Sequence, residues 1–120
     1  MQKQYIADSL CLTCQTERGE ITSLTLGGEE RLLLSRPLFC LRLRHRDGAT
    51  VMLIATDARS IREKEERLVF ADFGGAMSAL SVSIGIAADD ALHFHIRVDG
   101  VPGEYAVEWV DLPILHLPKH

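Results

Sequence analysis

The chain has 120 residues, a net charge of −4 and a hydrophobic content of 47%. This length is typical of one domain, and the apolar content is enough to build a core without disulfides or a structural metal. The acidic balance disfavours nucleic acid as a partner, because phosphate contacts require a basic surface. No apolar run approaches the ~18 residues of a membrane span, and the N-terminus has no signal-peptide pattern. We therefore expect no membrane partner and a cytoplasmic protein, or one whose leader is absent from this sequence.

The first two predicted strands cover residues 5–16 and 21–26. The segment between them, Glu17–Glu20, reads as a tight turn because Gly19 readily adopts a positive φ. These two strands are therefore expected to pair as a hairpin.

The first strand contains Cys11 and Cys14, which have the CxxC spacing of zinc and redox sites. In an alternating strand an odd offset places the two sulfur atoms on opposite faces. No second CxxC or HxxxH follows them. We therefore predict ordinary reduced thiols at these positions and at Cys40, and neither a metal site nor a cofactor.

The central segment predicts a second hairpin. Residues 38–46 alternate between an apolar face, with Phe39, Leu41 and Leu43, and a basic face, with Arg42, Arg44 and Arg46. Asp47–Gly48 follows, and this dipeptide is a strong signal for a two-residue turn. Residues 49–56 form the expected return strand.

A charged run occupies residues 57–67, DARSIREKEER. Ser60 and Glu63 have the spacing of a capping box, which would allow one or two helical turns. The run lacks an apolar stripe, so we prefer a solvated strand or loop, with the short helix as the second choice. A further strand is expected over residues 68–73.

The clearest alternation in the chain lies between Leu80 and Pro113. It predicts three strands joined by turns at Asp89–Asp90 and at residues 99–103. In the middle strand, four apolar side chains face inward and three polar ones face outward: Leu92, Phe94, Ile96 and Val98 against His93, His95 and Arg97.

Together these segments predict about eight or nine short strands separated by Gly, Asp and Pro turns. The fold class is all-β, an antiparallel β-sandwich formed by residues 1–120 as a single domain. No alternation of strands and helices argues for a parallel sheet.

His93 and His95 are two residues apart on one strand face, a pattern that can begin a metal site. Cupin barrels use such a pair. Here Asp99 stands where that pattern has Glu, and the second half of the motif is not recognisable. The preferred interpretation is that both histidines decorate a solvated face.

Arg42 and Arg44 belong to a ladder that could hold a carboxylate or a phosphate through forked hydrogen bonds. The simpler interpretation, which we favour, is an exposed face paired with acidic residues on neighbouring strands. Tyr105, Val107 and Trp109 are expected on one face of the last strand and in the core, with a ring platform for a sugar as the alternative.

Two segments resemble a known family. DSLCLTCQTERGEITSLTLGGEERLL is similar to the opening hairpin of galactose-mutarotase-like sandwich domains. RLVFADFGGAMSALSVSIGIAADDALHFHIRVDGVPGEYAVEWVDLPIL is similar to later strands of that domain as it occurs at the front of bacterial glycoside-hydrolase-like proteins. The resemblance implies a sandwich that supports a catalytic barrel, here an N-terminal domain or a portion of a larger supersandwich. The mutarotase base has no matching position in this chain.

We therefore predict a non-catalytic module of a carbohydrate-active protein, with structural support and weak carbohydrate binding as its roles. The carbohydrate-binding candidates are Trp109, His93, His95, Arg42 and Arg44. The alternatives are a small cupin-like metal-dependent enzyme using His93 and His95, or a homo-oligomeric interaction domain. A homodimer or higher oligomer through strand edges or an exposed sheet face is also expected, because a shortened sandwich leaves open edges.

Overall fold

The alternating segments form antiparallel strands in the computed structural model, which describes residues 2–32 and 34–112. The strands are β1 (Gln2–Ala7), β2 (Leu10–Gln15), β3 (Glu20–Leu26), β4 (Glu29–Glu30), β5 (Arg36–Pro37), β6 (Cys40–His45), β7 (Thr50–Ile54), β8 (Ser60–Lys64), β9 (Arg67–Ala71), β10 (Ser81–Ala88), β11 (Leu92–Asp99) and β12 (Tyr105–Asp111). Two short 3-10 helices, η1 (Ala55–Asp57) and η2 (Gly75–Met77), complete the described elements. In this part of the chain, no helix has the length and apolar character that crossing a membrane requires.

The strands belong to three sheets. The first has the order β1-β2-β3-β4, with β5 also paired to β3. The second has the order β11-β10-β9-β8, and the third has the order β12-β6-β7. The segment from β5 to β6 passes from the first sheet to the third, so these two sheets share one continuous stretch of chain. The all-β sandwich expected from the sequence is therefore confirmed.

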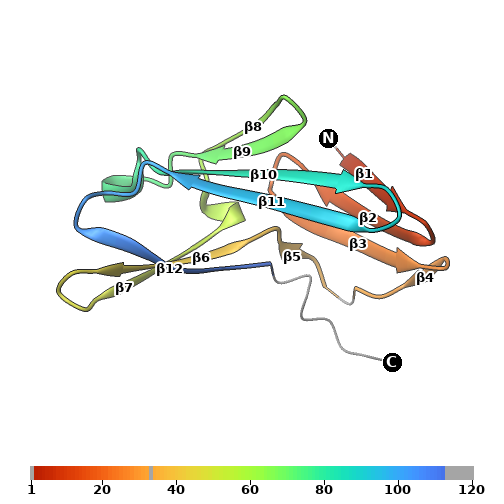
Figure 1. Ribbon diagram of the computed structural model, residues 1–120, viewed down its shortest axis with the longest axis horizontal. Helices are drawn as coiled ribbons and strands as arrows, with labels where there is room; N and C mark the ends of the chain where they lie inside the picture. The colour runs from red at the N-terminus through yellow and green to blue at the C-terminus, as the bar shows by residue number, and fades with distance from the viewer. Residues whose placement is uncertain (1, 33, 113–120) are drawn as a thin grey trace.

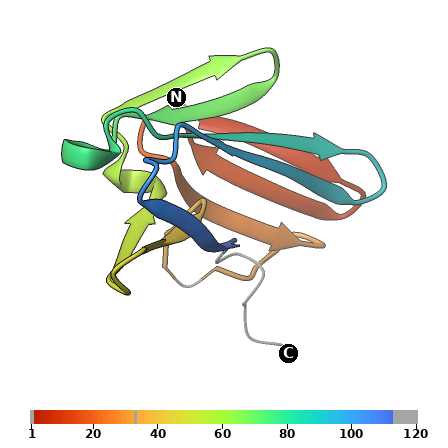
Figure 2. The ribbon, with the colours of Figure 1, turned by 60° about the vertical axis from the view of Figure 1, so that its left-hand side comes forward.

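Figures 1 and 2 show the sheet of β8 to β11 above, and β3 with the β6–β7–β12 sheet below. The β1–β2 hairpin lies at one side between these layers, and β1 contacts both β10 and β11. Lys3 of β1 forms an ion pair with Glu63 of β8. This ion pair connects β8, at the edge of the second sheet, to the first sheet.

The first predicted strand, residues 5–16, is wrong as a single element. It is two strands, because the chain reverses at Asp8 and Ser9 and pairs Ile6 with Cys11. Asp8 has a φ of 55°, and aspartate is one of the few residues other than glycine that adopts this left-handed conformation readily. The hairpin expected with residues 21–26 is confirmed as the pairing of β2 with β3.

The cysteines behave as the alternation predicts. Cys14 is fully buried in the core, and its burial raises the pKa of the thiol to about 11. Cys11 is half-buried on the other face, opposite the exposed side chain of Ile6. The three thiols are free, as expected.

The middle of the chain also follows the predictions. Residues 40–45 and 50–54 pair as a hairpin through the Asp47–Gly48 turn. Residues 60–64, the centre of the charged run, form a solvated strand, β8, and not the helical turn that Ser60 and Glu63 would allow. It turns into β9 at Glu65 and Glu66, whose positive φ values of 51° and 64° are those of a tight hairpin turn.

The core is centred on two phenylalanines from opposite layers. The ring of Phe39, which precedes β6, meets the ring of Phe70 in β9 edge-to-face at 5.1 Å between centroids. Both side chains are fully buried. Around them lie buried side chains from all three sheets: Leu12, Ile21, Leu41, Leu43, Val82 and Ile84. One core therefore serves the three sheets.

Gly19, in the turn between β2 and β3, packs directly on Phe70. It has a φ of 66°, and a Cβ atom there would lie 2.5 Å from Cε2 of Phe70. Gly27 has a similar φ of 60°, but a Cβ atom there would meet nothing within 4 Å. Both glycines therefore have a positive φ, but only Gly19 is packed closely against another side chain.

We predict that Gly19→Ala destabilises the protein much more than Gly27→Ala. Both substitutions force an L-residue into the left-handed region, at about 1–2 kcal/mol each. Only Gly19→Ala also overpacks the core, which adds roughly 1–3 kcal/mol. Unfolding in urea measures both losses, and equal losses would contradict the packing of the turn against Phe70.

Candidate functional site

The outer face of the β12-β6-β7 sheet gathers three of the five predicted binding residues. Arg42 and Arg44 project from it on β6, and Trp109 lies on it because it pairs with Arg42 across the sheet. A β-bulge between Val107 and Trp109 produces this placement. The extra residue, Glu108, reverses the alternation of the strand after Val107.

The expectation that Tyr105, Val107 and Trp109 share a core face is therefore wrong. Tyr105 pairs with His45 and packs against the core, whereas Trp109 is half-buried on the opposite, outer face. The core position is taken by Val110, which pairs with Leu41. A shallow hollow of about 240 Å³ lies beside the ring, lined by Trp109, Val110 and Asp111.

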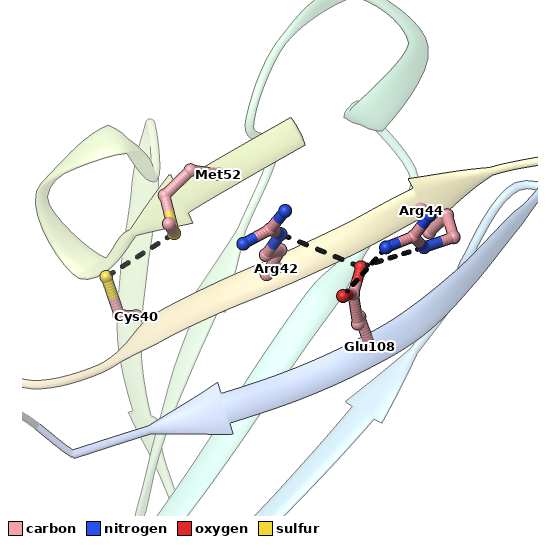
Figure 3. A network of polar contacts seen from close by, with 5 residues as sticks. All are labelled: Cys40, Arg42, Arg44, Met52 and Glu108. Atoms are coloured by element: carbon pink, nitrogen blue, oxygen red, sulfur yellow. Dashed lines mark hydrogen bonds and ion pairs between the residues drawn. The ribbon is translucent and has the colours of Figure 1, made fainter. Parts of the chain in front are cut away.

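Glu108 joins the two arginines (Figure 3). Nε and Nη2 of Arg44 donate to Oε2 and Oε1 of Glu108 at 3.1 and 3.0 Å, a forked pair of hydrogen bonds. Nε of Arg42 lies 3.6 Å from Oε2 of the same carboxylate. The hydrogen bonds from Arg44 hold the pKa of the Glu108 carboxyl below its usual value. The interpretation of the arginine ladder as a face paired with an acidic neighbour is confirmed for these two residues.

An apolar margin borders this polar centre. Met52 on β7 is 51% exposed and pairs with Arg42, so it belongs to the same face. Its sulfur lies 3.8 Å from the thiol of Cys40 (Figure 3). Partial burial, followed by the charge of Asp111, raises the pKa of that thiol, so Cys40 is a poor nucleophile there.

A second hollow, of about 470 Å³, lies at one end of this sheet and was missed from the sequence. It is bordered by the β6–β7 turn and the start of β12, with Arg46, Gly48, Gly103 and Glu104 in its lining. Arg46 lies beyond the end of β6, and its backbone N–H donates to the carbonyl of Glu104 at 2.9 Å. The two Gly-containing turns were visible in the sequence, but nothing in the pattern placed them side by side.

His93 and His95 lie elsewhere, on β11 in the second sheet. Both are exposed and face away from the core, as the alternation predicts. Nε2 of His93 lies 3.3 Å from Oδ1 of Asp89. Among the described residues, His93, Asp89 and Asp90 make the only group of three potential metal ligands. All three are exposed, and His95 is not part of the group. Hydrogen bonds from Asp90 and from the backbone of Ala91 lower the pKa of Asp89 to about 2.

The geometry of the β6–β12 face is that of a flat contact surface. An indole ring, two guanidinium groups and one carboxylate lie on the two neighbouring strands β6 and β12, and the carboxylate balances one of the two positive charges. These groups can stack on an apolar ring face and exchange hydrogen bonds with hydroxyl groups. No known protein family, no curated protein and no solved structure matches the chain.

We predict that Glu108→Gln lowers the melting temperature at neutral pH but not in acid. Because the folded pKa of Glu108 is lowered, its ion pairs stabilise the fold above the ordinary carboxyl pKa of 4.5. That contribution disappears as the pH falls through the lowered pKa. Thermal unfolding of both proteins between about pH 7 and pH 3 measures the difference.

Glu104→Gln is the matched control, because Glu104 is exposed near the start of the same strand and its carboxylate forms no ion pair with a described residue. A difference between Glu108→Gln and the native protein that persists unchanged in acid would contradict the ion-pair explanation.

Proposed function

We propose that this chain is a non-catalytic β-sandwich module of a carbohydrate-active protein, with structural support and weak carbohydrate binding as its roles. The single observation that carries the binding role is the position of Trp109, half-buried on the outer sheet face beside Arg42. The similarity of two sequence segments to galactose-mutarotase-like sandwiches supports the association with sugar-active enzymes. In this proposal, catalysis belongs to another domain of the protein.

The charge balance of this face indicates which sugars it suits. Glu108 accepts hydrogen bonds from Arg44 and lies 3.6 Å from Nε of Arg42, so its carboxylate already compensates one of the two positive charges. An anionic sugar would have to compete with that carboxylate. A neutral sugar needs only the apolar ring face and hydrogen-bonding groups, and the indole, the guanidinium groups and the carboxylate supply both.

The test is binding of neutral oligosaccharides followed by the fluorescence of Trp109, which is the only tryptophan in the chain. Stacking of a sugar on the indole should shift or quench its emission. We predict that Trp109→Ala abolishes binding measured by calorimetry on a panel of neutral glycans.

Val107→Ala is the matched control, since Val107 is 41% exposed on the same strand and precedes the bulge. It should leave the affinity unchanged. If Trp109→Ala binds as well as the native protein, or if no neutral glycan binds the native protein at millimolar concentration, sugar binding at this face is refuted and only the support role remains.

Self-association through a strand edge is a second proposal, favoured by β11. This strand has eight residues, pairs with β10 without a register shift and pairs with no other strand of the described residues. Its free backbone groups can pair with a second copy. We expect light scattering at tens of micromolar protein to give a dimer or higher oligomer, and a monodisperse monomer would contradict this proposal.

A further inference from the structure

The outer face of the β8–β11 sheet carries two rows of residues that cross all four strands. The registers place one row as Arg62, Val69, Ser83 and Arg97, and the next as Lys64, Arg67, Gly85 and His95. Residues directly opposite one another share a face, so all eight lie on the same side. The inner strands contribute Val69 and Arg67 from β9 and the small residues Ser83 and Gly85 from β10, and the two outer strands carry cations and a histidine.

Three cations of this face have no acidic partner. Arg62, Lys64 and Arg67 form no ion pair with any described residue, although the protein as a whole has a net charge of −4. By contrast, the cations Arg42 and Arg44 share Glu108, and Arg97 pairs with Asp99. A cluster of uncompensated charge is therefore concentrated on one sheet face.

The nearest carboxylates do not neutralise this cluster. Glu63 borders a hollow of about 300 Å³ with Arg62, Lys64 and Val69, but its carboxylate pairs with Lys3 of β1. By register, Glu63 belongs to the face of Leu68, which points into the core. Glu65 and Glu66 form the β8–β9 turn and make no ion pair with the neighbouring Lys64 or Arg67.

Arg67 is held in position before any ligand arrives. Its Nε donates to Oγ of Ser83 at 2.6 Å, and its Nη2 donates to the carbonyls of Ser83 and His95 at 3.3 and 3.2 Å. The guanidinium group lies across Gly85, where a Cβ atom would be 3.3 Å from Nη1. Nη1 is the part of the group with no hydrogen bond to a described residue, so its two N–H groups remain available as donors.

We propose that this face binds an acidic polysaccharide, a linear sugar chain that carries carboxylate groups. An extended chain that crosses the strands would meet Lys64, Arg67 and His95 in succession, with Arg62 beside them. Neighbouring strands are about 4.8 Å apart, so the successive positively charged or protonatable groups lie roughly 5–10 Å apart across the sheet. Such spacing suits one carboxylate per sugar, and the fixed Arg67 reduces the entropy lost on binding.

Nucleic acid fits this face less well. Duplex DNA presents a charge every ~1.7 Å along its axis, far denser than the cations here. The two rows contain no Phe, Tyr or Trp on which a base could stack. The serine and glycine floor instead leaves room for sugar hydroxyl groups close to the backbone.

The experiment compares polygalacturonate with its fully methyl-esterified form, which keeps the sugar chain and removes its charge. Calorimetry at about 20 mM salt should show binding of the acidic chain only, and the affinity should fall at about 200 mM salt. The double variant Arg62→Gln/Arg67→Gln should lose roughly tenfold or more in affinity.

The double variant Arg18→Gln/Arg46→Gln is the control, because it removes the same charge from two exposed arginines outside this face. It should bind nearly as well as the native protein, and melting temperatures establish that both variants fold. Trp109→Ala should also retain polygalacturonate binding, so failure of the neutral-sugar proposal and failure of this one are distinguishable. Equal weakening in both double variants, binding of the methyl ester, absence of binding at low salt, or tighter binding of a single-stranded oligonucleotide would each overturn the proposal.

Discussion

The contact on which the rest of the fold depends is the packing around Phe70. This ring belongs to the β8–β11 layer, yet it receives the edge-to-face ring of Phe39 from the opposite layer and the backbone of Gly19 from the β2–β3 turn. Three sheets therefore meet at one side chain. A chain of this length has little core to spare, so a single well-packed junction fixes how the two layers face one another. Both candidate binding faces are outer surfaces of sheets. The inner surfaces of the same sheets pack at this junction.

The two outer faces have similar residue types but different electrostatics. On the β6–β12 face, Glu108 lies between Arg42 and Arg44 and forms an ion pair with each of them. On the β8–β11 face, the corresponding carboxylate, Glu63, belongs to the inner side and pairs with Lys3, so Arg62 and Lys64 face solvent without a partner. The position of one acidic side chain in the alternation of a strand thus determines whether a basic face is balanced or is free to attract an anion.

Much of the fold could be predicted from the sequence because it follows from local alternation. The inward face of β11, the Asp47–Gly48 hairpin and the solvated strand in the charged run each depend on neighbouring residues alone. The predictions failed where the chain departs from strict alternation. Asp8 and Ser9 form a turn without Gly or Pro, so two strands were taken for one. The bulge after Val107 adds one residue, and the three-residue face expected for Tyr105, Val107 and Trp109 breaks at that point.

The candidate sites were harder to predict because they depend on pairing between strands that are distant in the sequence. The arginines were visible as a ladder, but their partner Glu108 is 64 residues from Arg44 and became its neighbour only through the β6–β12 pairing. The basic face was not visible at all, since Arg62, Arg67 and His95 lie in three separate segments. Its central feature, a guanidinium group lying across Gly85, is favoured by the absence of a Cβ atom opposite Arg67 on the next strand. Register across a sheet, and not spacing along the chain, is what brings such groups together.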